Sequence, residues 1–156
     1  MIKNYFPINQ SNSIKKKMLI QPFFVDQKVN DSKKIKGLGE NRSWSSSAVI
    51  KAIEKDLKRG INNILLFIVP LQKQKNPEDF SFHYEVIRKI KKYFGKDIVL
   101  IIDTCLCSIT HDGHCGITHQ KSIDLIKTHY SLGLAANTYL EAGADIIAPS
   151  LSLIHI

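Results

Sequence analysis

The feature that most constrains the fold of this chain is the alternation of short apolar runs with longer segments of helical periodicity. Continuous apolar runs at 64–69 and 98–102 are typical of strands that are covered on both faces. In the segments around them, apolar residues recur three and four positions apart, which indicates amphipathic helices. Strands that alternate with helices form parallel sheets with helical crossovers. The sequence therefore predicts an α/β fold.

Four strands follow from this pattern, with loops after them. The strands are expected over residues 18–25, 64–69, 98–102 and 145–148. Pro22 should interrupt or end the first strand, and Pro149 should stop the last. The segments 26–42 and 72–79 are expected to be loops, because they are polar and lack a period.

Three helices are indicated by their caps and apolar faces. Serines within 43–47 offer N-caps for the first helix, which Gly60 should end. The third helix is expected over 122–142, with Gly143 after it. The apolar face of the second helix should consist of Phe82, Val86, Ile87, Ile90, Tyr93 and Phe94.

Two architectures share this alternation, namely an open doubly wound sheet and part of a (β/α)8 barrel. No glycine-rich phosphate loop follows the first strand, which disfavours the nucleotide-binding form of the open sheet. A complete barrel needs eight strands and about 250 residues, whereas this chain has 156 residues. Periodicity alone leaves both architectures open.

Composition and charge limit the classes of function. The net charge is +8, but the lysines occur in short runs with few aromatic residues among them, which disfavours a nucleic-acid-binding surface. No apolar run reaches the roughly 18 residues of a membrane span, and the N-terminus lacks the apolar core of a signal peptide. We therefore expect a cytoplasmic protein without a nucleic-acid or membrane partner.

The residues that carry chemistry cluster after the third predicted strand. All three cysteines, Cys105, Cys107 and Cys115, lie within eleven positions. Thiolates are preferred ligands of Zn²⁺, and three protein ligands leave a fourth position open, as in catalytic sites. Cys105 and Cys107 should point to the same side of an extended chain. Gly113 and Gly116 should let the loop fold back and bring Cys115 toward them.

Other interpretations of these residues stay open at this point. A disulfide between Cys105 and Cys107 would be strained and is rare in the cytosol. A non-catalytic zinc-binding or thiol-sensing α/β module would carry the same three thiols. His114 could be a fourth ligand, but we favour a role as a partner that orients the site by hydrogen bonding. His111 is expected to be solvated.

The cysteine segment resembles a known signature. Asp-Thr-Cys-Leu-Cys at 103–107, followed by Thr110 and Gly-His-Cys-Gly at 113–116, is similar to the metal-binding motif of the zinc-dependent porphobilinogen synthases. Ala-Gly-Ala-Asp-Ile-Ile-Ala-Pro-Ser at 142–150 resembles the segment that precedes the next active-site region of that family. The similarity extends over about 18–150 and is densest in the last third.

The resemblance implies a fold and an activity. Members of this family are (β/α)8 barrels, so 18–150 would be the N-terminal half of a TIM barrel and 1–17 an N-terminal arm or tail. The full-length parent would condense two molecules of 5-aminolevulinate to porphobilinogen, with loss of water, in tetrapyrrole biosynthesis. Such enzymes are commonly homo-octamers, so the resemblance implies a homo-oligomer for the full-length parent.

The resemblance also assigns roles to residues. It makes Cys105, Cys107 and Cys115 the Zn²⁺ ligands and places His114 beside them. It makes Asp103 a wall of the active site, with simple loop capping as the alternative. The two lysines that form Schiff bases with the substrates in this family would lie after residue 150. We therefore expect the chain to be a truncated fragment that is inactive by itself.

The chain departs from the family pattern at three places. Ile109 stands where an aromatic residue is usual, 37–42 lacks a proline turn, and Leu125 with Ile126 replaces an Asn-Asp pair. None of these changes removes a metal ligand. The last six residues, 151–156, match what one reading frame of a common sequencing adapter encodes, and we expect them to be a scar and not a continuing strand.

Overall fold

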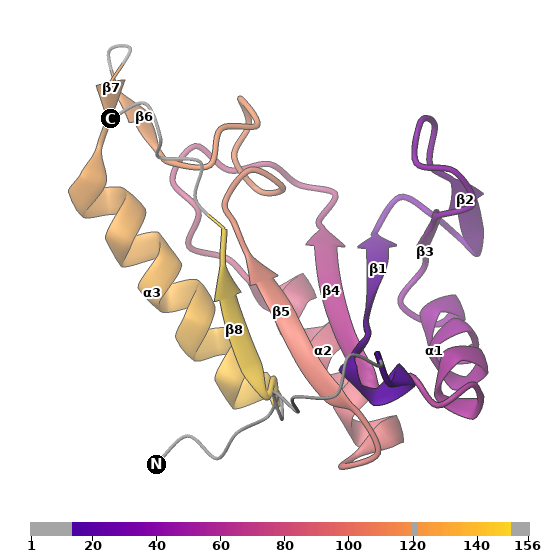
Figure 1. Ribbon diagram of the computed structural model, residues 1–156. Coiled ribbons are helices and arrows are strands. Elements are labelled where there is room, and N and C mark those ends of the chain that lie inside the picture. The colour runs from indigo at the N-terminus through magenta and orange to yellow at the C-terminus, as the bar shows by residue number, and fades with distance from the viewer. Residues whose placement is uncertain (1–13, 120–121, 151–156) are drawn as a thin grey trace.

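The structure, a computed structural model, describes residues 14–119 and 122–150. Its main element is a six-stranded sheet with the order β2-β3-β1-β4-β5-β8 (Figure 1). Its parallel strands include β1 (Ile20–Asp26), β4 (Asn63–Val69), β5 (Val99–Thr104) and β8 (Ile146–Pro149). Each of these four strands pairs in parallel with the next one in the order. The predicted parallel α/β fold is confirmed.

Three helices lie between these strands in the chain. They are α1 (Ala48–Lys58), α2 (Ser81–Phe94) and α3 (Leu125–Ala142). In Figure 1, α2 lies behind the sheet and α3 runs alongside β8. The helices α2 and α3 also pack against each other. The alternation of four strands and three helices is the one that the sequence predicts.

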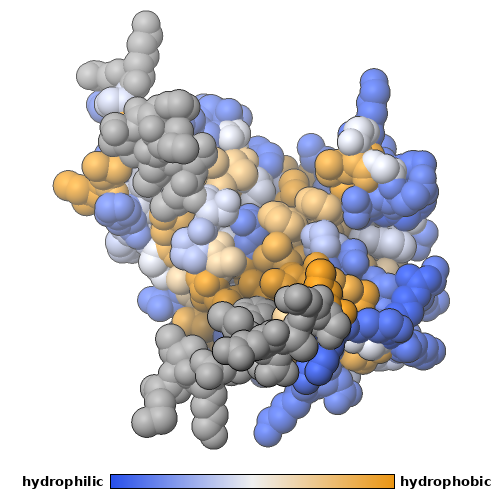
Figure 2. Space-filling view, in the orientation of Figure 1, coloured by the Kyte–Doolittle hydropathy of each residue, from blue (hydrophilic) through white to orange (hydrophobic). Residues whose placement is uncertain are grey.

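The hydrophobic core lies between the helices and one face of the sheet. On β4, the side chains of Ile64, Leu66 and Ile68 are buried in this core. Leu65 and Phe67, which alternate with them, point to the opposite face and are half-buried. Figure 2 shows apolar residues gathered over the central strands on that face. The predicted burial of β4 is therefore complete on one face and partial on the other, because the described helices pack on one face.

The first strand is neither interrupted nor ended by Pro22, so that prediction is wrong. The strand β1 continues through Pro22 to Asp26 and pairs with β4 along its whole length. On its other edge, β3 (Arg42–Trp44) reaches only Phe24 and Val25. The outer edge of β1 at Pro22 thus has no described partner, and a residue without an N–H group is tolerated there.

The segment predicted as a loop at 26–42 contains a strand. In this segment, β2 (Ser32–Lys34) pairs antiparallel with β3 to form a short hairpin at the edge of the sheet. Strands of three residues are too short to show the alternation on which a sequence-based assignment depends. The prediction of a continuous loop is therefore wrong for these residues.

The second helix buries a different set of side chains than predicted. Tyr93 was expected on the apolar face, but it is 58% exposed and its hydroxyl donates a hydrogen bond to Glu54 at 2.5 Å. His83 is buried instead and packs among aromatic rings. The other five predicted apolar positions of α2 lie in the core or pack against it.

The third helix begins later than predicted. Ser122–Ile123 forms β7, which pairs with β6 (Thr118–His119) in a separate two-stranded sheet. The helix α3 then starts at Leu125, and the Asp124 side chain caps it by accepting a hydrogen bond from Lys127 N at 3.0 Å. The aspartate is a preferred N-cap residue, so local chemistry explains this boundary.

The predictions for the two ends of the chain fall mostly outside the described residues. Residues 1–13 of the predicted arm and the predicted scar at 151–156 both lie there. The described end of the arm passes into a short 3₁₀ helix, η1 (Lys16–Met18). Within 14–119 and 122–150, no helix combines the length and the apolar character that crossing a membrane requires.

Candidate metal centre

The cysteine loop, defined here as residues 105–117, leaves the carboxyl end of β5 at the top of Figure 1. Leu100 and Ile102 are fully buried and hold this strand in the sheet. Asp103 and Thr104 are its last residues, directly before the first cysteine. In parallel α/β folds, functional residues gather at the carboxyl ends of strands because the loops converge there. The predicted site is therefore located where such folds place their chemistry.

The three cysteines lie close together, although Cys115 follows Cys107 only after a loop of several residues. The Sγ atoms of Cys105 and Cys107 are 3.2 Å apart. The Sγ atoms of all three cysteines lie within 4.8 Å of one another. Cys105 is buried, Cys107 and Cys115 are half-buried, and all three are free thiols. The Cys105–Cys107 disulfide, which the sequence disfavoured, is therefore not formed in this structure.

The donor set and its spacing suit a thiophilic metal ion. A tetrahedral zinc ion with Zn–S bonds of about 2.3 Å separates its sulfur ligands by roughly 3.8 Å. The observed separations, 3.2 Å for one pair and at most 4.8 Å for any pair, include this value. Three sulfur ligands would leave a fourth position for water or substrate. The residues present could therefore hold a metal ion.

The electrostatic environment of the site disfavours uncompensated negative charge. Burial raises the pKa of the Cys105 thiol, so this thiol keeps its proton in the chain without metal. Burial also raises the pKa of Asp103 to about 6. The pKa of Tyr139 on α3 is raised by burial first and then by the nearby charges of Asp103 and Cys105. A bound cation would offset the charge that the thiols acquire when they lose their protons.

The two histidines of the loop, His111 and His114, both lie on its exposed part. His111 is exposed. The His114 ring turns back on its own loop, where its Nδ1 accepts a hydrogen bond from Gly116 N at 3.0 Å. The backbone of His114 donates to Asp112 Oδ1 at 3.1 Å and accepts from Thr110 Oγ1 at 2.7 Å. His114 thus brackets Cys115 through local bonds, and its role toward a metal stays a prediction.

A second loop, 70–79 after β4, braces the cysteine loop through Gln74. The backbone N–H of Gln74 donates to Ile109 O at 2.8 Å, and its carbonyl accepts from His111 N at 3.3 Å. Its side-chain Oε1 accepts from Glu78 N at 2.9 Å and from Asp79 N at 3.1 Å. The sequence analysis missed Gln74, because a polar residue in a non-periodic segment gives no signal of its long-range partners.

Behind the site lies a buried histidine that the sequence analysis also missed. His83 on α2 is 3% exposed and stacks on Tyr139, with ring centroids 5.3 Å apart and planes at 14°. Its Nδ1 has no hydrogen-bond partner in the described part of the chain. Burial lowers the pKa of His83 to about 4, so the ring is neutral near neutral pH. It is a core residue and not a ligand of the cysteine site.

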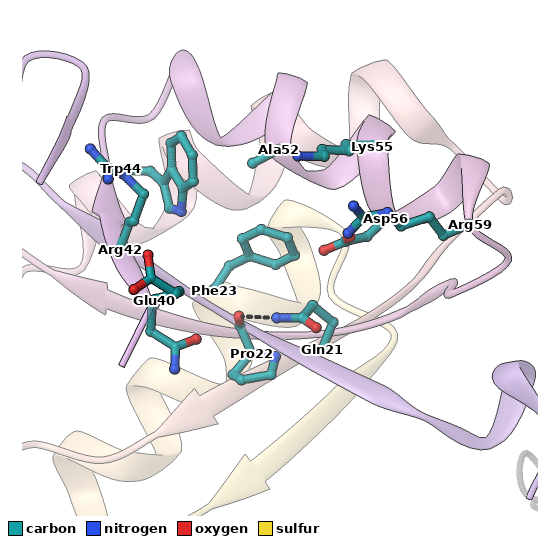
Figure 3. Close-up of a pocket in the computed structure, with 11 residues that line it drawn as sticks. Gln21, Pro22, Phe23, Glu40, Arg42, Trp44, Ala52, Lys55, Asp56 and Arg59 are labelled. Carbon is teal, nitrogen blue, oxygen red and sulfur yellow. Dashed lines mark hydrogen bonds and ion pairs between the residues drawn. The ribbon is translucent and has the colours of Figure 1, made fainter. Parts of the chain in front are cut away.

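A separate cavity of about 450 Å³ lies between β1, β3 and α1 (Figure 3). Figure 3 shows Phe23 and Trp44 beside it, with charged side chains of α1 at its rim. The cysteines are not among its lining residues, so it is distinct from the candidate metal centre. The residues that line it are Gln21, Pro22, Phe23, Glu40, Asn41, Arg42, Trp44, Ala52, Lys55, Asp56 and Arg59.

Comparison with known proteins places this site in a family. A family model described as delta-aminolevulinic acid dehydratase matches residues 3–153. The chain belongs to this family. The resemblance inferred from the cysteine segment is thereby confirmed, and it extends over nearly the whole chain and not only over the cysteines.

Curated relatives named delta-aminolevulinic acid dehydratase agree with this membership. The relative from Methanothermus sociabilis is 32% identical over 143 residues, which cover 90% of this chain and 45% of the relative. The relative from Staphylococcus aureus is 35% identical over 146 residues, with the same coverage of the two chains. The chain thus spans less than half the length of these relatives.

A solved structure agrees with the family in fold. The crystal structure of delta-aminolevulinic acid dehydratase (porphobilinogen synthase) from Toxoplasma gondii, in complex with the reaction product porphobilinogen, matches with a TM-score of 0.80 at 26% identity. The match covers 90% of this chain and 42% of that chain. The sheet described above corresponds to the N-terminal part of the TIM barrel of that enzyme, which confirms the predicted architecture.

Proposed function

We propose that the protein to which these residues belong is a porphobilinogen synthase, which condenses two molecules of 5-aminolevulinate to porphobilinogen with loss of water. Membership of the delta-aminolevulinic acid dehydratase family supports this activity. The observation that carries the proposal is the cluster of three free thiols within 4.8 Å at the carboxyl end of β5. The family match over residues 3–153 favours the enzyme over a non-catalytic zinc-binding or thiol-sensing module.

We assign the metal of this site as Zn²⁺, held by Cys105, Cys107 and Cys115. Sulfur ligands favour zinc over the hard cations Mg²⁺ and Ca²⁺, which prefer oxygen. When bound, the ion would supply Lewis-acid polarisation of a substrate carbonyl. Two apolar residues of the cysteine loop, Leu106 and Ile109, are at most 1% exposed and anchor the loop in the hydrophobic core. Ile109 thus fills the position at which the family usually has an aromatic residue.

The roles of the neighbouring residues follow from their positions. Asp103 is the penultimate residue of β5, two positions before Cys105, and is half-buried, so its carboxyl group is available as a wall of the substrate site. His114 keeps the Cys115 segment folded through its ring nitrogen. Assembly into a homo-octamer stays a prediction that derives from the resemblance, and a cytoplasmic location stays a prediction that derives from the sequence.

The metal assignment is tested on the 156-residue chain itself, purified with reduced thiols. We expect it to take up about one equivalent of Zn²⁺, measured by atomic emission after gel filtration. A variant with all three cysteines replaced by serine should take up none. The variant His111→Ala, which changes an exposed residue of the same loop, is the control and should bind zinc like the unchanged chain. Equal zinc content in all three proteins would refute the assignment.

The activity is tested by extending the chain past residue 150 with its natural continuation. We expect the extended protein to convert 5-aminolevulinate to porphobilinogen, measured colorimetrically, and we expect the 156-residue chain to be inactive. The family resemblance places the two Schiff-base lysines in the extension, where a desolvated lysine can act as a nucleophilic amine. An extended protein that binds zinc but forms no porphobilinogen would favour the non-catalytic module.

A further inference from the structure

The third cysteine is followed at once by a connection to α3. The backbone N–H of Ile117 donates a hydrogen bond to Thr128 Oγ1 at 2.9 Å. The same hydroxyl donates to Asp124 O at 2.7 Å. The backbone of Asp124 also donates to Ile117 O at 2.8 Å. Thr128 is fully buried, and its hydroxyl therefore links the end of the cysteine loop to the first turn of the helix without competition from water.

Gly116 shows how closely the loop approaches this helix. A Cβ atom at Gly116 would lie 3.0 Å from Ile123 Cγ2 and 3.3 Å from Thr128 Oγ1. Gly113 has a φ of +72°, whereas Gly116 is not among the glycines with positive φ. The absence of a side chain at Gly116 is thus required by space and not by backbone conformation. Gly116, the residue after Cys115, thus leaves no room for a side chain beside the Thr128 hydroxyl.

The other two cysteines do not depend on this connection. Cys105 and Cys107 follow the buried strand β5 directly, so the sheet sets their position. Cys115 comes at the far end of a loop, and the bonds of its neighbours decide how near its sulfur lies to the other two. One of these bonds is the Thr110 Oγ1 to His114 O contact on its N-terminal side. The Thr128 contact holds its C-terminal side.

We propose that Thr128 is a positioning residue for Cys115: its hydroxyl fixes the Gly116–Ile117 segment to α3 and thereby sets the distance of the third thiol from the other two. This inference rests on the metal-binding function proposed above. It assigns the helix α3 a part in the metal centre although no residue of the helix is a ligand there. Loss of the hydroxyl would leave the buried N–H of Ile117 without a partner, which displaces the loop toward solvent.

The test compares three substitutions on one helix. Thr128→Val keeps the shape and removes the hydroxyl, whereas Thr128→Ser keeps the hydroxyl and removes a methyl group. Thr138→Val is the matched control, because the Thr138 hydroxyl donates to Leu134 O at 2.8 Å on the same helix and makes no hydrogen bond to the cysteine loop among the described residues. The dissociation constant for Zn²⁺ is measured by competition with a chromogenic chelator. Absorption of the Co²⁺-loaded chain reports the coordination geometry, and thermal unfolding without metal reports stability.

We expect Thr128→Val to weaken Zn²⁺ binding by about tenfold or more, as removal of a group that orients a metal ligand usually does. Thr128→Ser should lower the unfolding temperature but keep the affinity within about threefold. Thr138→Val should lower the unfolding temperature and leave the affinity unchanged. A purely structural role of Thr128 would instead make affinity follow stability in all three variants, and that result would overturn the proposal.

A second variant covers the case in which Thr128→Val does not fold. Gly116→Ala keeps the threonine but inserts a methyl group between the loop and the hydroxyl, and it should weaken Zn²⁺ binding to a similar degree. Unchanged affinity in Gly116→Ala overturns the proposal. If the unchanged chain binds no Zn²⁺, the metal centre itself is refuted; if it binds Zn²⁺ and Thr128→Val binds equally well, the role of Thr128 alone is refuted.

Discussion

The two parts of the cysteine site differ in how the chain holds them. Cys105 and Cys107 come directly after β5, a strand whose residues Leu100 and Ile102 are fully buried, so the sheet positions the start of this pair. Cys115 lies on a loop that is held by individual hydrogen bonds to Gln74 and Thr128 at its two sides. One part of a site can thus be positioned by the hydrophobic core, while the other part depends on a few polar contacts.

The largest effect on zinc affinity should come from removing Cys105 and Cys107 together. Changing both Cys105 and Cys107 to serine should abolish measurable Zn²⁺ binding, whereas Cys115→Ser alone should weaken it by on the order of a hundredfold, since each thiolate of a zinc site contributes roughly 3 kcal/mol. Competition titration of both proteins measures the difference. Zinc affinity that survives the double change would show that the pair does not anchor the metal.

A substitution that creates a cavity in β5 tests whether this strand holds Cys105 and Cys107 in place. Ile102→Ala should lower the free energy of unfolding by about 2–5 kcal/mol, because the side chain is fully buried next to the site. Ile126→Ala, at an 84% exposed position of α3, is the control and should change it by less than about 0.5 kcal/mol. Urea unfolding measures both. A change in the free energy of unfolding below about 1 kcal/mol for Ile102→Ala would mean that β5 is not held firmly in the core.

Acid should destabilise the core behind the site through His83. Burial lowers its pKa to about 4 in the folded chain, with smaller opposing contributions from the Ile68 backbone and Asp79 and a further lowering by Lys73. Below a pH of about 6.5 the unfolded chain binds a proton that the folded chain does not. The histidine therefore costs about 3 kcal/mol of stability at pH 4 and nothing above pH 7.

The measurement compares this chain with His83→Phe across that pH range by urea unfolding. The variant should lose less stability than the unchanged chain as the pH falls from 7 to 4. Parallel pH profiles of the two proteins would contradict the neutral, buried state of the histidine.

The smallest effect should come from the loop brace. Gln74→Ala removes the side-chain bonds to Glu78 and Asp79 but keeps the backbone bonds to the cysteine loop, so it should cost about 1 kcal/mol of stability. Zinc affinity should fall by only about threefold, less than for Thr128→Val. Gln72→Ala, at an exposed position of the same loop, is the control. If Gln74→Ala weakened zinc binding as much as Thr128→Val, the Gln74 side chain would matter as much as α3 for the position of Cys115.

Much of the fold could be predicted from the sequence because its signals are local. The apolar run of β4 and the periodic face of α2 predicted a strand and a helix that the structure contains. The hairpin of β2 and β3 escaped, since three-residue strands carry no period. Tyr93 was assigned to the core by spacing, yet it lies at the rim of the buried face, where tertiary packing and not periodicity decides exposure.

The sequence by itself determined which three thiols are the candidate metal donors and which strand leads to them. Cys105 and Cys107 were expected together because residues two apart in an extended chain point to the same side; their Sγ atoms do lie 3.2 Å apart, although the chain bends at Leu106 and turns at Cys107. Only the tertiary structure decided where Cys115 lies and which residues hold its loop there. The loop is bonded to the Gln74 backbone through Ile109 and His111 and to the Thr128 hydroxyl through Ile117, and both partners come from other segments of the chain. Hydrogen bonds between distant segments form only after the sheet and helices have packed, so no local pattern encodes them.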